Sequence, residues 1–444
     1  MHTTTRLQSM KNPIKTTDNN LKGEPFDAAL HLENLQHLAA KPLCELSLDE
    51  RPNLLIFPSD FQTHGDDIGK QHIFTIENER LITGNIMGFI GYHDTQVSIR
   101  SRFAQDDCND YFIHYMLQRV FAINLFDLKF GTDNESIFDF LIYLFPSFLK
   151  KAMRNGIYKE YQTQEHNDVN VRGRIDVSRH IRQNIPFTGK VSYTTREYAT
   201  DNHLTQLIRH TIEYISLHHF GGSILNNDED TKVAVSKIRQ VTMTYNRGAR
   251  HQIVNQNLRP IRHPYFSEYR NLQHLCLQIL RQEGIKYGYD GSPVYGVLFD
   301  GAWLWEEYLN AVLSDAGFLH PRNKTGEGGK RIFADKIGNE TVMSDFHKAG
   351  IVLDAKYKSY SNWKEITRND RFQLLAYMHL YDADRSGFIV PVRIPPDMKR
   401  TRSLIGRGGT MSIIGMNVAT VCRNFKEFST YMAKEEKLLI KRID

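Results

Sequence analysis

The sequence predicts an α+β multidomain protein with a β-rich N-terminal domain, a mainly helical middle and a C-terminal α/β domain. Three observations predict it. Short apolar runs separated by turn residues fill residues 50 to 105, and apolar residues at helical spacing dominate residues 106 to 290. After about residue 300, helices alternate with strands, which is typical of an α/β unit. A chain of 444 residues is long enough for two or three such domains.

The composition is that of an ordinary water-soluble protein, with 41% hydrophobic and 24% charged residues and a formal charge of +5. The C-terminal part is more basic, which permits a polyanionic partner. Four cysteines lie far apart without a CxxC pair, which excludes a zinc ribbon or a disulfide framework and fits a reducing cytoplasm. No run of about 18 apolar residues occurs, so we expect no membrane contact.

The chain before residue 291 divides into three parts. We expect residues 1–25 to be a disordered lead and residues 26–105 to form a β-rich domain with hairpins, in runs such as NLLIF and QVSIR. Residues 106–290 carry several amphipathic helical patterns and are expected to be mainly helical. Between its helices, residues 167–184 are polar and arginine-rich, which indicates a structured connection. Its arginines are either a solvated face or a site for an anion or a partner.

Residues 291–444 form the expected C-terminal domain. The order is a helix over 302–317, two strands at 340–346 and 350–358 joined by a short turn, a helix over 368–381 and a strand over 387–394. In an extended strand, Val352, Asp354 and Lys356 share one face. A carboxylate and an ammonium therefore lie next to each other at the end of an apolar strand. Such charges form either a plain ion pair or part of a site that holds a metal and a phosphate.

Asp345 precedes the turn on the partner strand and can complete a metal site. Two carboxylates, Asp345 and Asp354, and the carbonyl of Ala355 are hard oxygen ligands of the kind that Mg²⁺ prefers. Lys356 would then lie beside an attacking water, as phosphodiester hydrolysis requires. The arrangement has the PD-(D/E)xK pattern of restriction-type nucleases, although Ser344 stands where that motif usually has proline. Asp335 is a rival for the first acid.

Three further residues are candidates for the same site. Gln373 and Tyr377 are four residues apart on the following helix, so they share a face, and this face can point toward the strand at residues 350–358. A QxxxY helix after the DxK strand is a recurring accessory of this nuclease group. Glu306 can add an acid from the preceding helix. The alternative for all three is ordinary helix packing or a solvated face.

Two other chemistries are excluded. The stretch NKTGEGGKR lacks the first glycine and the Ser/Thr of a phosphate loop, so the chain has no Walker A motif of its own. His203 and His210 share a helix, but no carboxylate or cysteine stands at ligand spacing, so a zinc site is not expected.

The chain resembles the McrC family, the nuclease subunits of McrBC-type restriction systems that are GTP-dependent and specific for 5-methylcytosine. The resemblance rests on RGRIDVSRHIR with Gly173, Arg174 and Asp176, and above all on SDFHKAGIVLDAKYK followed by FQLLAYM. It implies a cytoplasmic bacterial defence complex in which this chain binds a ring of McrB-like AAA+ GTPase subunits through residues 106–290, stimulates GTP hydrolysis and cuts double-stranded DNA with Mg²⁺. By the same resemblance, Asp345 and Asp354 would be metal ligands and Lys356 the catalytic lysine.

Two other functions stay open at the level of sequence. The chain could be a non-catalytic adaptor that activates the ring, or the subunit of a related restriction enzyme that cuts specific unmethylated sites. The complete set of two acids and a lysine argues against the adaptor, which would not need all three.

Overall fold

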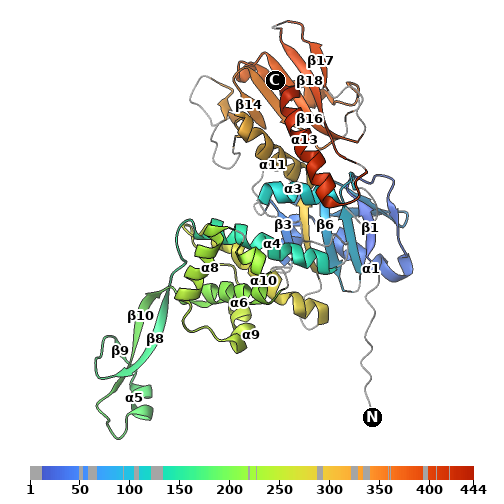
Figure 1. The fold of residues 1–444 in the computed structure, drawn as a ribbon. Helices are drawn as coiled ribbons and strands as arrows, with labels where there is room; N and C mark the ends of the chain where they lie inside the picture. The colour runs from blue at the N-terminus through green and yellow to red at the C-terminus, as the bar shows by residue number, and fades with distance from the viewer. Residues whose placement is uncertain are drawn as a thin grey trace. The chain divides into compact units, whose positions relative to one another are not determined.

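The computed structural model divides the chain into two compact units, and each is described by itself. Unit 1 combines residues 1–140 with 291–444, and unit 2 comprises residues 141–290. The structure describes residues 13–49, 54–58, 68–93, 95–104, 110–121, 134–218, 221–226, 228–287, 294–321, 329–333, 341–358, 360, 362–393, 399–406, 408–419 and 421–444. Figure 1 shows the elements in chain order.

The first sheet of unit 1 has five strands in the order β1-β7-β6-β11-β3. Four come from the N-terminal part, and the fifth, β11, comes from the start of the C-terminal part. The bounds are β1 Ile14–Thr17, β3 Leu54–Phe57, β6 Ile86–Tyr92, β7 Thr95–Arg100 and β11 Val294–Asp300. β6 and β7 form the hairpin that the alternating sequence predicts. Apolar side chains of these strands pack with α1 (Ala28–Ala39) and α2 (Leu43–Asp49) in one core.

A smaller sheet completes the N-terminal part. It has three antiparallel strands in the order β2-β5-β4, namely β2 Glu24–Pro25, β4 Phe74–Glu77 and β5 Arg80–Thr83. A short 3₁₀ helix, Ile68–Lys70, precedes β4.

The second large sheet of unit 1 has the order β14-β15-β16-β18-β17. Its strands are β14 Phe346–Lys348, β15 Ile351–Ala355, β16 Arg385–Val392, β17 Lys399–Ser403 and β18 Thr410–Asn417. The central strands β15, β16 and β18 are parallel, and the two edge strands are antiparallel to their neighbours. A parallel pair needs a crossover, and α12 (Arg368–Leu380) supplies it between β15 and β16. The structure therefore shows a mixed α+β multidomain protein.

Helices cover both faces of this sheet. α12 packs on β15 and β16, and its apolar side chains share a core with Phe388, Met411 and Ile413. α13 (Phe425–Ile443) packs on β18, and α11 (Gly301–Leu313) packs on α3 (Tyr111–Phe121). A 3₁₀ turn, Ser314–Ala316, follows α11, and the short strands β12 (Lys330–Arg331) and β13 (Thr341–Val342) pair with each other.

Three features of the unit differ from the expected domain organisation. Residues 14–17 are not a disordered lead, because β1 adds to the first sheet in parallel with β7. The stretch expected as β-rich from residue 26 also contains the helices α1 and α2. The C-terminal domain expected to begin at residue 291 does not stand apart either, because β11 pairs with β6 and β3 of the N-terminal sheet.

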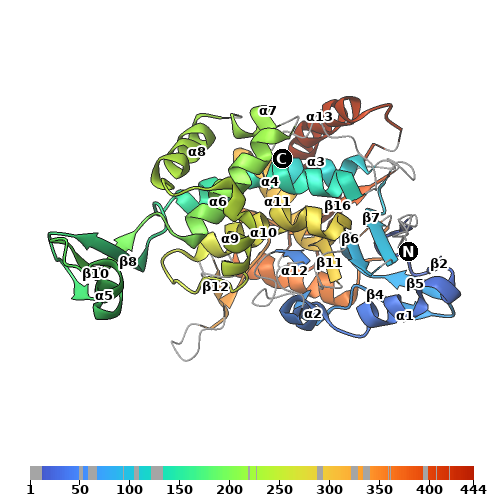
Figure 2. The same cartoon turned by 90° about the horizontal axis from the view of Figure 1, so that it is seen from below.

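Unit 2 combines a helical body with a projecting hairpin (Figures 1 and 2). The body contains most of α4 together with α6 to α10, with α6 packed against α10, α9, α8 and α7. The bounds are α4 Asn134–Met153, α6 His203–Leu217, α7 Gly221–Leu225, α8 Glu229–Val241, α9 Arg250–Gln256 after a 3₁₀ turn at Arg247–Ala249, and α10 Ser267–Tyr287. The mainly helical middle thus includes a β element that the helical pattern does not predict.

The hairpin is a long antiparallel pair with a folded tip. Strands β8 (Glu160–Asp168) and β10 (Val191–Ala199) pair along nine residues each, and β9 (Arg174–Ile175) adds to β10. The seven-residue helix α5 (Val177–Gln183) packs on β10. Segment 167–184, expected as a structured connection, forms this tip. Arg179 is buried there and donates to the backbone oxygens of His166 and Tyr193, so this arginine holds the tip together.

Among the residues that the structure describes, no helix is both long and apolar enough to cross a membrane.

Candidate functional site

The hairpin of β14 and β15 carries the acids that the sequence singles out. Gly350 forms the turn with φ +76°, a conformation that favours glycine, and the strands then pair from Lys348–Ile351 to Phe346–Leu353. β15 is buried along Ile351–Asp354 between β14 and β16. Asp345 directly precedes β14 and Asp354 lies near the end of β15, so both acids lie at one end of the hairpin.

Asp354 is a buried carboxylate, with 1% of the residue exposed. Neither of its buried oxygens has a hydrogen-bond partner among the described residues, apart from the ammonium Nζ of Lys356 at 3.0 Å from Oδ2. Burial raises the pKa of Asp354 well above its usual range, the charge of Asp345 adds to this, and Lys356 acts in the opposite direction. An acid in this position can gain stability from a cation.

Asp345 reaches across the hairpin to the end of β15. Its Oδ2 accepts a hydrogen bond from the backbone N–H of Ala355 at 2.6 Å. The structure therefore brings Asp345, Asp354 and Ala355 together at one point. The rival acid Asp335 lies outside the described residues.

Lys356 lies between two carboxylates. Its Nζ is 3.0 Å from Asp354 Oδ2 and 3.6 Å from Asp370 Oδ1. Burial acts to lower the pKa of Lys356, but Asp354, Asp345 and Asp370 outweigh it and raise the pKa above its usual value. The lysine is therefore a fixed, protonated cation in this arrangement, suited to orient or neutralise an anion.

Asp370 is a contact residue of this lysine that sequence reasoning missed. Its Oδ2 accepts hydrogen bonds from Tyr360 Oη and Thr367 Oγ1, both at 2.8 Å, which leaves Oδ1 toward Lys356. Burial acts to raise the pKa of Asp370, but these hydroxyls and the nearby lysines outweigh it and lower the pKa. Its position in the sequence suggests only a helix start, because Thr367 caps α12 and an acid three residues after a cap is common there.

Gln373 and Tyr377 share a face of α12, as their spacing predicts. Gln373 Nε2 donates to Tyr377 Oη at 2.7 Å. Tyr377 is buried, and burial, with the charges of Asp345 and Asp354, raises its pKa to about 12, so its hydroxyl lies in the electrostatic field of the acids. Gln373 itself is exposed and contacts the site through this tyrosine.

Glu306 is connected to the site through a histidine that the sequence analysis did not consider. His320 Nδ1 is 2.7 Å from the backbone oxygen of Asp345, and His320 Nε2 is 3.8 Å from Glu306 Oε1. The imidazole therefore lies between Glu306 on α11 and the backbone of Asp345. No pattern in the sequence indicated His320, because it lies 25 residues before Asp345 on a connecting segment.

The two carboxylates of Asp345 and Asp354 and the carbonyl of Ala355 are donors that suit a hard divalent cation which keeps part of its water shell. They are fewer than a full set of side-chain ligands, and among the described residues no group of three or more acidic, histidine or cysteine side chains could hold a metal. Two carboxylates and one carbonyl leave open positions, which Mg²⁺ commonly fills with water and phosphate oxygens. The unpartnered buried oxygens of Asp354 are what such an ion would satisfy.

The residue after Lys356 joins the site to the first sheet of unit 1. Tyr357 is buried, its hydroxyl donates to Met87 Sδ at 3.6 Å, and the guanidinium of Arg102 lies 4.7 Å from its ring centre. Met87 belongs to β6, and Arg102 follows β7. The end of β15 is therefore packed against the N-terminal part of the same unit.

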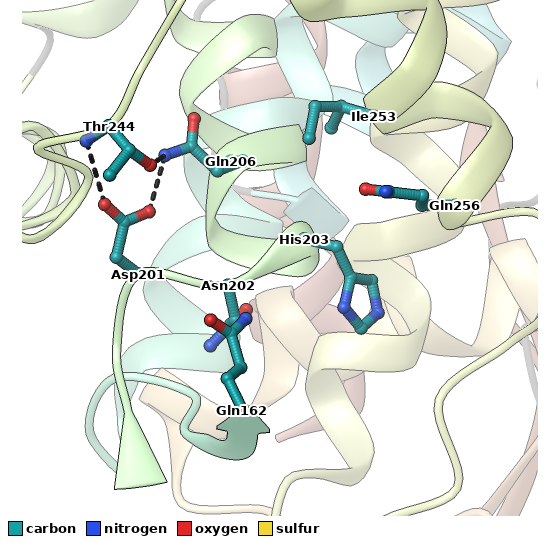
Figure 3. A pocket seen from close by; sticks show the side chains of 8 residues that line it. All are labelled: Gln162, Asp201, Asn202, His203, Gln206, Thr244, Ile253 and Gln256. Atoms are coloured by element: carbon teal, nitrogen blue, oxygen red, sulfur yellow. Dashed lines mark hydrogen bonds between the residues drawn. The ribbon is translucent and has the colours of Figure 1, made fainter. Parts of the chain in front are cut away.

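Unit 2 contains a hollow of about 500 Å³ at the start of α6 (Figure 3). Asp201 accepts hydrogen bonds there from Gln206 Nε2 at 2.5 Å and from the backbone N–H of Thr244 at 2.9 Å. His203 Nδ1 pairs with Glu160 at 2.8 Å. Because these polar groups satisfy one another, the hollow has no set of groups aimed at a ligand. His210 is buried against Tyr245.

Comparisons with known proteins place the chain in a family. No curated protein matches it. Among solved structures, it is similar to a half-complex of a tetradecameric assembly of Thermococcus gammatolerans McrB AAA+ hexamers with bound McrC, with 14% identity and a TM-score of 0.48 over 95% of this chain and 100% of that one. A cryo-EM structure of the Thermococcus gammatolerans McrBC complex matches with 13% identity and a TM-score of 0.31 over 68% and 87% of the two chains.

The family model for the McrBC 5-methylcytosine restriction system component matches residues 81–391, well over half of the chain. This match spans the β6–β7 hairpin, the whole of unit 2 and the β14–β15 hairpin together with Asp345, Asp354 and Lys356. It confirms the resemblance to the McrC family that these segments indicated in the sequence. The chain therefore belongs to the McrBC 5-methylcytosine restriction system component family.

Proposed function

We propose that this chain is the nuclease subunit of an McrBC-type restriction complex in the cytoplasm, where it hydrolyses phosphodiester bonds of methylated double-stranded DNA. The observation that carries the proposal is Asp354, a buried carboxylate whose oxygens have no hydrogen-bond donor among the described residues except Lys356 at Oδ2, with Asp345 beside it. A purely structural ion pair would not leave the second buried oxygen without a partner, because that costs about 1–3 kcal/mol. The mixed sheet with its α12 crossover supports a PD-(D/E)xK nuclease domain.

Each side chain has a defined task in this proposal. Asp345, Asp354 and the carbonyl of Ala355 would hold Mg²⁺, which when bound supplies an activated water and neutralises phosphate charge. Lys356 holds its proton and orients or neutralises the phosphate oxygens, while Asp370 keeps the lysine in position. Tyr377 and Gln373 support the site from α12, and His320 with Glu306 fixes the backbone at Asp345.

Unit 2 is the proposed binding region for an AAA+ GTPase ring of the McrB type, whose GTP hydrolysis the chain would stimulate. The tip of its hairpin exposes apolar side chains, with Val177 62%, Ile185 67% and Phe187 69% exposed. Clustered apolar exposure is typical of an interaction site. The missing Walker A motif supports a division of labour in which the partner hydrolyses the nucleotide.

The test is a cleavage assay with the full chain, its genomic AAA+ neighbour, GTP, Mg²⁺ and methylated or unmethylated plasmid. Lys356→Ala should lower cleavage by about 10²–10³-fold or more, because a positioned charge at the transition state is removed. The same variant should still stimulate GTP hydrolysis. Cleavage of the unmethylated plasmid alone would point to a related restriction enzyme. Stimulated GTP hydrolysis without cleavage of either plasmid would leave the chain as an adaptor and would refute the nuclease.

A further inference from the structure

The edge strand of the second sheet in unit 1 is basic. β17 has the sequence KRTRS, with Lys399, Arg400 and Arg402 and no acid; Arg400 is half-buried and the other four residues are exposed. It ends the described sheet, with β18 as its only neighbour there. Three cations in five residues concentrate positive charge on one edge of the domain.

The strand register relates this edge to the candidate active site. Arg400 lies opposite Ile413, Ile413 opposite Phe388, and Phe388 opposite Asp354. Side chains in one row across a sheet point to the same face, so Arg400 and Asp354 share a face. Arg402, two residues after Arg400, points to that face as well. Asp354 and Arg400 are three strand spacings apart, which is roughly 14 Å. This distance corresponds to about four base-pair steps of duplex DNA.

Trp363 fixes one of these arginines on the face of the site. The guanidinium of Arg402 lies 5.2 Å from the centre of the Trp363 ring. Trp363 belongs to the connection from Lys356 to α12, and it packs against the core that contains Val352 and Tyr377. The same connection therefore begins at the proposed catalytic lysine and rests on the basic strand.

Charged edge strands also have a simpler explanation. Exposed edges pair with other strands, and proteins commonly prevent this with charged side chains, especially lysine. That explanation accounts for positive charge on the edge, but it gives no reason for two arginines on the face of Asp354.

We propose that Arg400 and Arg402 of β17 bind the phosphate backbone of double-stranded DNA beyond the bond that is cut. The inference rests on the proposed nuclease function and adds the surface on which the substrate lies. Phosphate is the ligand chemistry that matches two arginines on one face of an exposed strand.

The experiment measures how the affinity of the full chain for a DNA duplex of about 30 base pairs depends on salt concentration. Every sample carries Lys356→Ala to prevent cleavage. Each phosphate contact contributes about 0.9 to the slope of log K against log salt. Arg400→Gln with Arg402→Gln should therefore lower the slope by about 2 and weaken binding. Arg400→Glu with Arg402→Glu should weaken binding further.

Lys399→Gln is the matched control, because Lys399 alternates to the opposite face of the same strand and should leave the slope unchanged. An unchanged slope in the double Gln variant would overturn the proposal, and so would equal binding by the Glu and Gln variants. Absence of salt-dependent binding by the parent chain would overturn it as well. A chain that binds DNA through the arginines but shows no Lys356-dependent cleavage would instead refute the nuclease function.

Discussion

Asp354 is placed where a carboxylate is costly. The strand that carries it is buried on both sides, and among the described residues its oxygens have no donor other than Lys356. Local rules for strands favour an apolar residue at this position, and the proposed metal-binding role would explain the exception. The sequence indicated this candidate site for the same reason, since a charge on an apolar strand can be recognised without a structure.

Asp354→Asn should therefore stabilise the chain in the absence of metal. Removing a buried charge relieves a desolvation cost, and we expect the free energy of unfolding to rise by about 1–3 kcal/mol. Urea unfolding without divalent ions measures it. Added Mg²⁺ should stabilise the parent chain and leave the Asn variant unchanged, because only a state that binds the ion gains from it. Equal stabilisation of both chains by Mg²⁺ would exclude Asp354 as a ligand.

Asp370 is the second carboxylate, after Asp354, that contacts the ammonium of Lys356. Asp370→Asn keeps an oxygen for Tyr360 and Thr367 but removes the charge 3.6 Å from the ammonium. We expect kcat of DNA cleavage to fall about ten- to a hundred-fold, a range comparable to the loss of a supporting residue at a metal site, with KM for DNA little changed. Thr367→Ser is the control, since it retains the cap of α12. A loss confined to KM would assign Asp370 to DNA binding.

Helices and strands with an apolar face were predictable, and the hairpin of unit 2 was not. Strands β6 and β7 are buried along most of their length, and in the sequence they are short apolar runs separated by turn residues. In β8 the exposed and half-buried residues alternate without any buried one, so the sequence EYQTQEHND has no hydrophobic period to detect. Its pairing with β10 depends on backbone hydrogen bonds and polar cross-strand contacts such as Tyr193 to Asp168.

Gly173 is the residue on which the tip of this hairpin depends. A Cβ atom at this position would lie 2.0 Å from the backbone oxygen of Thr194, so β9 can approach β10 only with glycine. Gly173→Ala should separate β9 from β10 and abolish hydrogen-exchange protection at the tip. Stimulation of the partner's GTP hydrolysis should fall with it.

Gly222→Ala provides the control in the same unit, because nothing lies within 4 Å of its added Cβ. Normal GTPase stimulation by the Gly173 variant, with the tip unprotected, would exclude the tip from partner binding.

At the scale of the molecule, the candidate active site depends on both ends of the chain. β11 lies between β6 and β3, and Tyr357 beside Lys356 contacts Met87 and Arg102. The sequence placed a boundary at residue 291 because helical patterns end there. Strands β6 and β11 pair although they lie about 200 residues apart in the sequence. Such a pairing leaves no local sequence pattern, so the shared sheet of the N-terminal and C-terminal parts was not predictable.

A fragment of residues 291–444 should not fold cooperatively, because β11 would expose both edges and the partners of Tyr357 would be missing. A fusion of residues 1–140 to 291–444 through a flexible linker should fold. Thermal unfolding followed by circular dichroism compares the two. A cooperative transition in the isolated fragment would show that the C-terminal part is independent.

The position of β11 also sets an order for biosynthesis. While the chain emerges from the ribosome, β3 lacks its neighbour until residue 300 has been made, whereas unit 2 is already complete by residue 290. The segment proposed to meet the partner can thus be shaped before Lys356 has been translated. A truncated product released before that point would present a docking hairpin without any means of cutting the chromosome of its host.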